Sequence, residues 1–188
     1  MATWKKFQLS NYSISERHGF KGLANCGIMK VGDFKSSFGE NSFERMKELK
    51  MVETKNYVVN GKDIKVVRLS GTGKKFVKKS ILGKLYKYNV RQLSHDLKLS
   101  DKYLSLSQPE RNSWVHEGYM KEEYEKMGLS EERQEKENIE TVDACYTNSE
   151  GNAVGVEIVT ANYSSGKVQG KMNAMKHFSG GGIIDNVR

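Results

Sequence analysis

The strongest local structural signal in this chain lies at residues 52–69. Two β-prone runs, VETKNYVV and KDIKVVRL, are separated only by Asn60 and Gly61. Both central residues of a tight type I′ turn need positive φ, which Asn and Gly adopt at low cost. An Asn-Gly pair between two such runs is the strongest short-range hairpin signal. The sequence therefore predicts an antiparallel hairpin with strands at 52–59 and 62–69.

Three helices are predicted before this hairpin. Apolar residues recur at helical spacing in residues 14–30, and residues 31–38 are followed by Gly39, which suits the position after a helix end. In residues 40–51 either Asn41 or Ser42 can cap a third helix. The expected core positions of the first and third helices are Ile14, Phe20, Leu23, Ala24, Ile28, Phe43, Met46 and Leu49.

A lysine-rich segment follows the hairpin. Residues 71–88 predict a helix that packs Phe76, Ile81 and Leu85 against the core and leaves its lysines outside. Three helices, a hairpin and a basic helix are the elements of a winged helix-turn-helix. We therefore expect a winged-helix DNA-binding domain over residues 1–90.

The net charge differs between the two halves of the chain. Residues 1–90 contain 19 Lys and Arg against 7 Asp and Glu, a net charge of +12, and residues 91–188 contain 12 against 16, a net charge of −4. A basic half joined to an acidic half indicates that only the first half faces a polyanion. The alternative is a basic surface that is merely solvated.

Candidate DNA-binding residues follow from the way a winged helix binds. Its third helix lies in the major groove and its hairpin contacts the backbone or the minor groove. Glu44 and Glu48 also point outward from the third helix, where they would repel phosphate or accept a hydrogen bond from cytosine N4. We expect duplex DNA as the partner, with no cofactor required, although a winged helix can also serve protein contacts. The candidates are Asn41, Ser42 and Arg45 for base edges, Lys47 and Lys50 for phosphates, and Lys55, Lys62, Lys65 and Arg68 for the hairpin.

The second half, residues 91–188, predicts a small α/β domain, so that the whole chain is α+β. Residues 121–140 are rich in charge and leave little to bury, which favours an exposed, partly helical or mobile excursion. Periodicity otherwise predicts a helix at 91–106, strands at 113–120, 140–147 and 152–161, a helix at 164–178 and a strand at 182–187.

Cysteine usage and hydropathy favour the cytoplasm. Cys26 and Cys145 lie far apart in segments of different character, which argues against a disulfide framework and against a zinc site. The N-terminus has no apolar core of signal-peptide length, and no stretch approaches the roughly 18 apolar residues of a membrane span. We therefore expect a soluble cytoplasmic protein without a membrane partner.

The sequence resembles a known family, the replication-relaxation proteins of plasmids, phages and other mobile elements. In the first half the resemblance rests on a second helix ending in Phe38-Gly39, on Arg45 and Leu49 spaced as Arg-x-x-x-Leu, and on a Ser70-x-x-Gly73 turn after the hairpin. In the second half, four segments are similar in order and spacing to segments of the family's second domain. These segments are SHDLKLSDKYLSL, WVHE, VDACYT and GVEIVTANYSSGKVQGKMNAMKHF. The family's second domain resembles a reduced restriction-endonuclease-like fold.

This resemblance implies a DNA-binding protein that takes part in replication, relaxation or mobilisation of its element. A nuclease of the endonuclease-like fold needs acidic residues on adjacent strands to hold Mg²⁺ and a lysine that positions the attacking water. Asp143 and Glu157 would be the metal ligands, with Glu117 as a further one. The family's lysine position, two residues after the glutamate, is Val159 here, so Lys167 or Lys171 would have to substitute as the catalytic lysine.

Several alternatives remain open for the second half. We expect Asp143 and Glu157 to lie close together on neighbouring strands with no lysine rigidly held beside them, which favours an inactive scaffold over an enzyme. The rival functions are a Mg²⁺-dependent endonuclease, resolvase-like or restriction-like, and a transcriptional repressor whose second half dimerises or senses a ligand. Partners would be a second copy or replication and mobilisation proteins.

We expect the pair His95-Asp96 to be a helix cap or a helix-surface pair and not a catalytic dyad.

Overall fold

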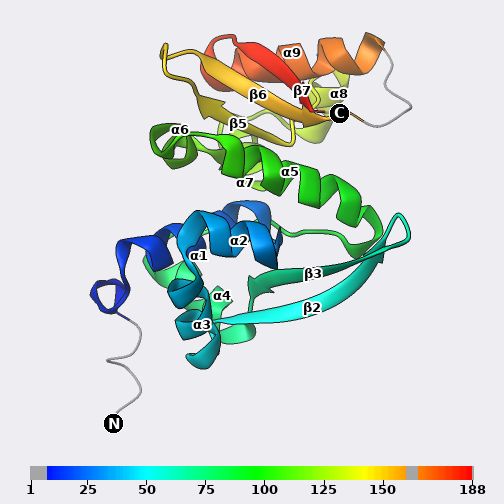
Figure 1. Ribbon diagram of the computed structural model, residues 1–188. Helices are drawn as coiled ribbons and strands as arrows, with labels where there is room; N and C mark the ends of the chain where they lie inside the picture. The colour runs from blue at the N-terminus through cyan, green and yellow to red at the C-terminus, as the bar shows by residue number, and fades with distance from the viewer. Residues whose placement is uncertain (1–7, 160–164, 188) are drawn as a thin grey trace. The chain divides into compact units, whose positions relative to one another are not determined.

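The computed structural model describes residues 8–159 and 165–187 (Figure 1). The chain is mixed α+β with two sheets and divides into two compact units, Met1–Leu104 and Ser105–Arg188. The boundary between the units follows Leu104, whereas the charge distribution predicts it at residue 90. No helix among the described residues combines the length and the apolar character that a membrane span requires.

The first unit consists of helices and one three-stranded sheet. Strand β1 pairs antiparallel with β3, which pairs antiparallel with β2, so the sheet order is β1-β3-β2. The elements are η2 (Leu9–Asn11), α1 (Ile14–Cys26), β1 (Met29–Lys30), α2 (Val31–Phe38), α3 (Glu40–Glu48), β2 (Val52–Val59), β3 (Lys62–Leu69), α4 (Gly71–Ser80), η3 (Val90–Gln92) and α5 (Leu93–Ser105).

Helix α1 begins at a capping box and ends earlier than predicted. The Ser13 side chain accepts from the Glu16 amide, and the Glu16 carboxylate accepts from the Ser13 amide. Gly27, at φ 74°, ends the helix, because this left-handed region favours glycine. The expected core residue Ile14 is instead 69% exposed, since it occupies the first helical position, outside the buried face.

The two glycines inside α1 are explained by its packing against α2. A Cβ at Gly19 would lie 2.7 Å from the ring of Phe34, and one at Gly22 would lie 3.2 Å from the ring of Phe38. Contacts under 3.0 Å are essentially absent in real proteins and contacts of 3.0–3.4 Å are uncommonly tight, so a larger residue at either position would require the neighbouring rings to move. Glycine lowers helix propensity here but permits the close approach.

The predicted hairpin is confirmed residue for residue. Val52 pairs with Leu69 and Val59 pairs with Lys62, and the turn residues Asn60 and Gly61 have φ of 51° and 74°. These positive values are the reason that the Asn-Gly pair predicted the turn.

Helix α5 covers one face of this hairpin and therefore belongs to the first unit. Leu93 and Leu97 pack with the buried side chains of Ile28 and Val66. Half-buried residues of the hairpin and of the segment before α5 complete the cluster, namely Tyr57, Val59, Ile64 and Tyr88. The domain boundary predicted at residue 90 would separate the hairpin from the helix that buries it.

The lysine-rich helix α4 is shorter than predicted. It ends at Ser80, and Ile81 and Leu85 lie beyond it with only partly buried side chains. The chain returns to α1 instead, where the Tyr86 amide donates to the Ala24 carbonyl at 2.8 Å. Phe76 of α4 is buried as predicted, with its ring 5.2 Å from the ring of Phe20.

The second unit contains a four-stranded sheet in the order β4-β5-β6-β7. The first two pairings are antiparallel and β6 pairs parallel with β7 across α9. The predicted strands and helices occur in the predicted order, but only Val115 and His116 of the strand predicted at 113–120 are in a strand, because one helix ends at Ser113 and the next begins at Glu117. The ends of the strand at 152–161 and of the helix at 164–178 reach into 160–164, outside the described residues. The elements are α6 (Gln108–Ser113), β4 (Val115–His116), α7 (Glu117–Lys126), α8 (Glu131–Lys136), β5 (Ala144–Thr147), β6 (Ala153–Ile158), α9 (Ser165–Ser179) and β7 (Ile183–Val187).

The charged segment 121–140 is partly helical and mostly exposed, as predicted, but a few of its residues pack on the rest of the second unit, so it is not a separate excursion. Tyr124, Leu129 and Ile139 form a buried cluster with Ala174 of α9. The Tyr124 hydroxyl donates to the Ala174 carbonyl at 3.0 Å. A few apolar residues at the right spacing hold α7 and α8 against α9, and this outweighs their charged composition.

Candidate nucleic-acid interface and carboxylate site

The guanidinium of Arg45 on α3 is engaged in contacts within the first unit, although its side chain remains 50% exposed. Its Nη1 donates to the Glu16 carboxylate at 2.7 Å and its Nη2 donates to the Asn11 carbonyl at 2.9 Å. Glu16 is 1% exposed, so this ion pair satisfies a buried charge. The sequence predicted Arg45 as a reader of base edges, whereas here it joins α3 to the capping box of α1.

The rest of the exposed surface of α3 mixes both signs of charge. Asn41 is exposed, Ser42 is partly buried and Lys47 is exposed. Glu44 lies 3.2 Å from the ammonium of Lys35 and 3.9 Å from that of Lys47, so an acidic residue stands among the predicted phosphate contacts. Helix α3 therefore offers two neutral polar groups, and its three acidic and two basic residues give it a net charge of −1.

The hairpin presents three exposed lysines on two faces. Because side chains alternate along a strand, the register places Lys55 and Lys62 on one face and Lys65 on the other. None of the three forms an ion pair with a described residue, and all are exposed. These lysines are positioned as cations that reach outward from both sides of a ribbon.

Arg68 is not an outward cation of the hairpin. Its Nε donates to the Glu53 carboxylate at 2.7 Å, and its Nη1 donates to the Tyr88 hydroxyl. The arginine side chain is 19% exposed, because Tyr88 covers that face of the hairpin. Arg68 thus holds the segment before α5 against the hairpin, although the sequence predicted a phosphate contact.

In the second unit the sheet register aligns the three predicted acidic residues. His116 pairs with Ala144, which pairs with Val156, so the next positions are Glu117, Asp143 and Glu157. The Glu117 amide donates to the Asp143 carbonyl at 2.9 Å, and the Asp143 carboxylate accepts from the Ile158 amide at 2.8 Å. Asp143 and Glu157 are therefore cross-strand neighbours, as expected.

A lysine is held beside this pair, and the expectation that none would be is wrong. The Lys171 ammonium lies 3.1 Å from the Glu157 carboxylate and donates to the Thr141 carbonyl at 2.6 Å. The Lys171 side chain is 12% exposed and the Glu157 side chain is 7% exposed, so water has little access to this ion pair. The cause is the packing of α9, since a Cβ at Gly155 would lie 2.9 Å from the sulfur of Met175, one helical turn after Lys171. Lys167, one turn earlier, is exposed.

These residues do not fit a preformed metal site. In residues 8–159 and 165–187 no three His, Cys, Asp or Glu side chains converge as metal ligands would. The Lys171 ammonium already neutralises Glu157, and a backbone amide already occupies one oxygen of Asp143. What the arrangement shows is a buried ion pair next to a hydrogen-bonded carboxylate.

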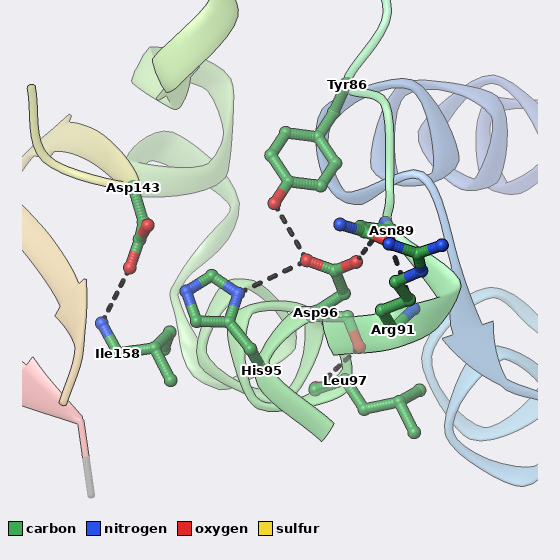
Figure 2. Close-up of polar contacts among 9 residues, drawn as sticks. Tyr86, Asn89, Arg91, His95, Asp96, Leu97, Asp143 and Ile158 are labelled. Carbon is green, nitrogen blue, oxygen red and sulfur yellow. Dashed lines mark hydrogen bonds and ion pairs between the residues drawn. The ribbon is translucent and has the colours of Figure 1, made fainter. Parts of the chain in front are cut away.

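Asp96 is the centre of a buried network in the first unit (Figure 2). Its carboxylate accepts from the Tyr86 hydroxyl at 2.8 Å and from the Asn89 amide at 2.6 Å, and His95 Nδ1 lies 3.2 Å away. Asp96 is 1% exposed, so it is not the helix-surface group that the sequence suggested. It fixes the segment between α4 and α5, in part as a cap on backbone before α5.

Both cysteines are free and buried. Burial, together with the charges of Asp96 and Asp101, raises the pKa of Cys26 well above its usual value. Burial alone raises the pKa of Cys145 to about 12. Both groups are therefore neutral thiols at physiological pH, which are poor nucleophiles and poor metal ligands.

No family model, curated protein or solved structure matches this chain. Arguments about its function therefore depend on its own charges and geometry. The resemblance to replication-relaxation proteins is carried by the sequence motifs alone.

Replacing Asp96 by asparagine is expected to lower the free energy of unfolding by about 2–3 kcal/mol, because hydrogen bonds to a buried charged acceptor contribute about 1.5–3 kcal/mol. The asparagine amide would also face the Asn89 amide, donor against donor. Asp101 on the same helix is the matched control. It is exposed and pairs with Lys30, so Asp101→Asn should cost less than about 1 kcal/mol. Urea unfolding of both variants measures the difference, and equal losses would contradict the anchoring role.

Proposed function

We propose that this chain is a DNA-binding protein that contacts duplex DNA through a winged helix-turn-helix in its first unit. The order α2, Gly39, α3 and then the β2–β3 hairpin supports this proposal, as does the additional pairing of β1 with β3. The first unit, residues 1–104, contains 22 basic and 9 acidic residues, a net charge of +13, whereas residues 105–188 contain 9 and 14, a net charge of −5.

The observation that carries this proposal is the set of hairpin lysines. Lys55, Lys62 and Lys65 extend from an exposed ribbon without an acidic partner among the described residues. Lysines of the second unit are in several cases neutralised within one helical turn, as Lys121 is by Glu117 and Lys126 by Glu123. Unpaired cations on a hairpin are suited to phosphates, since each neutralised phosphate releases counterions and strengthens binding.

Helix α3 contributes less to recognition than the sequence suggested. Arg45 is engaged with Glu16, and Glu44 stands beside Lys47, so base contacts would come from Asn41 and Ser42. Phosphate contacts position a protein on DNA, whereas base contacts carry its sequence preference. We therefore expect binding that is sensitive to salt and only modestly sensitive to sequence.

The experiment is a titration of the full chain against a 30-base-pair duplex by fluorescence anisotropy, over a range of salt concentrations. With at least three phosphate contacts, the logarithm of the association constant should fall against the logarithm of salt with a slope of roughly −3 or steeper. Absence of binding at low salt would overturn the proposal.

In the cell, we propose, this activity serves the replication, relaxation or mobilisation of a mobile element, with the second unit supplying contacts to a second copy or to replication proteins.

A second candidate function is a metal-dependent endonuclease, and the position of Lys171 favours it. Asp143, Glu157 and a lysine are the residue types that such a nuclease uses, and the sheet register and α9 bring them to one place. Against it stands the ion pair itself, which occupies Glu157. A structural ion pair and a catalytic lysine predict different results for the same substitution.

Lys171→Met is expected to lower the free energy of unfolding by about 3 kcal/mol, because it leaves the buried Glu157 carboxylate without its cation. Lys167→Met, one turn earlier on the exposed side of α9, should leave stability within about 0.5 kcal/mol. The same proteins are incubated with supercoiled plasmid in Mg²⁺ and in EDTA. Cleavage that requires Mg²⁺ and is abolished by Lys171→Met and Glu157→Gln would promote the nuclease function.

A further inference from the structure

Helix α4 carries an unusual concentration of positive charge. Its ten residues include Lys74, Lys75, Lys78 and Lys79 and no acidic residue. The surrounding residues 64–95 contain nine lysines and arginines and again no Asp or Glu. No other region of the chain departs so far from neutrality over this length.

The packing of α4 directs this charge outward. Gly73, Phe76 and Val77 are buried, and Phe76 contacts the rings of Tyr12 and Phe20. The four lysines occupy the opposite, exposed side. This surface, which we call the α4 lysine face, lacks exposed aromatic or large aliphatic side chains.

The α4 lysine face has an electrostatic cost that folding does not require. Lys74 and Lys78 are four residues apart, and like charges at this spacing destabilise a helix by a few tenths of a kcal/mol. Other helices of this chain place an acid at that spacing, as in the pairs Lys121–Glu117 and Arg133–Glu137. Lys74, Lys75 and Lys78 have no such partner among the described residues. Their repulsion would be relieved by an external polyanion.

The α4 lysine face borders the end of α3. The Ser70 amide donates to the Met51 carbonyl at 3.0 Å, and the Ser70 hydroxyl donates to the Lys50 carbonyl at 2.6 Å. A Cβ at Gly73 would lie 2.0 Å from the Met51 carbonyl oxygen, so only glycine permits this approach. Lys50, exposed and at φ 56°, thus stands next to the first turn of α4.

We propose that the α4 lysine face is a second contact surface for the backbone of duplex DNA, continuous with Lys50 and additional to α3 and the hairpin. The proposal rests on the DNA-binding function proposed above and names a further part of its interface. The four lysines span about 7.5 Å of helix axis. A duplex carries about four phosphate charges over that length, so the two charge densities match.

The chemistry of the α4 lysine face favours duplex DNA over other polyanions. Single strands are bound by aromatic side chains on which bases stack, and none is exposed on α4. Membrane-binding helices bury a large apolar face in the lipid, and the buried apolar side of α4 is instead occupied by α1. Contacts from lysine to phosphate carry no sequence information, so this surface should act alike on all sequences.

The test compares the full-length protein with the variant Lys74→Gln, Lys75→Gln, Lys78→Gln on two unrelated 30-base-pair duplexes. We expect affinity at about 0.1 M salt to fall by about a hundredfold on both duplexes and the salt slope to shrink by about 2 to 3. The thermal midpoint should stay unchanged or rise slightly, because the lysines repel one another. The matched control, Lys126→Gln, Lys136→Gln, Lys176→Gln, makes the same change in net charge on α7, α8 and α9 and should bind nearly as wild type does.

Each other outcome has a definite meaning. Wild-type affinity and slope in the α4 variant would overturn this inference and leave the DNA-binding proposal intact, whereas a wild-type protein that binds no duplex would remove both. A charge-preserving variant, Lys74→Arg, Lys75→Arg, Lys78→Arg, should retain binding. If it loses binding as the glutamine variant does, positive charge is not the cause and the inference is wrong. Binding to phosphatidylserine vesicles that depends on α4, without binding to duplex DNA, would also overturn it.

Discussion

Replacing Lys55, Lys62 and Lys65 by glutamate is expected to weaken the binding of duplex DNA by about a thousandfold at about 0.1 M salt. Each phosphate contact contributes roughly 0.9 to the salt slope, so losing three contacts costs nearly three orders of magnitude, and reversed charge adds repulsion. The three side chains are exposed and have no ion-pair partner among the described residues. Their replacement should therefore change the thermal midpoint by only a few degrees.

The control for this experiment separates local contact from total charge. Replacing Lys126, Lys136 and Lys176 by glutamate makes the same change in net charge, from +8 to +2, on the second unit. Anisotropy titrations at several salt concentrations compare the two variants with wild type. If both lose affinity equally, only net charge matters, and if neither does, the hairpin is not a contact.

A chain that ends at residue 90 is expected to be largely unfolded, whereas one that ends at residue 107 should fold and bind DNA. The shorter chain lacks α5, whose Leu93 and Leu97 pack on Val66 of the hairpin. Burial of one leucine contributes about 1.5–3 kcal/mol. Loss of Leu93, Leu97, Leu99 and Tyr103 together approaches the roughly 5–15 kcal/mol that stabilises an entire domain. The Asp96 network would be lost as well.

Thermal melts followed by circular dichroism test this expectation. A cooperative transition of the 1–90 fragment at the temperature seen for the 1–107 fragment would show that α5 is dispensable. A point substitution in the full chain gives an independent measure. Leu97→Ala should cost about 2–5 kcal/mol, and Val90→Ala, at a residue 55% exposed, should cost almost nothing.

Short-range patterns in the sequence were sufficient for most of the individual elements. The hairpin at 52–69 and the helix at 31–38 have the predicted bounds, because Asn60-Gly61 and Gly39 act on their immediate neighbours. Helix α5 and strand β7 also lie where apolar periodicity placed them. Predictions were less accurate where a segment packs on a part of the chain far away in the sequence. The charged segment 121–140 is an example, since it packs on α9 through Tyr124 and Leu129.

The candidate site residues were chosen by type, and type alone did not determine their partners. Arg45 and Arg68 were predicted as outward cations. Arg45 is half exposed but pairs with Glu16, whereas Arg68 is largely covered and is engaged by Glu53 and Tyr88. The Tyr12-x-x-x-Glu16 neighbourhood of α1 contained no signal that an arginine 29 residues later would pair with it. The hairpin lysines differ because nothing packs on them.

By itself the sequence determined most of the helices and strands, the Asn60-Gly61 turn and the unequal charge of the two halves, since each depends on residues close together in the chain. Only the tertiary structure decided that α5 buries the hairpin, that Arg45 pairs with Glu16 and that Lys171 neutralises Glu157. Arg45 and Glu16 are 29 positions apart and Lys171 and Glu157 are 14 positions apart, and the packing of whole helices brings each pair together. A buried charge takes whichever opposite charge that packing brings within reach, because leaving it unpaired costs several kcal/mol, and no local pattern specifies which one that is.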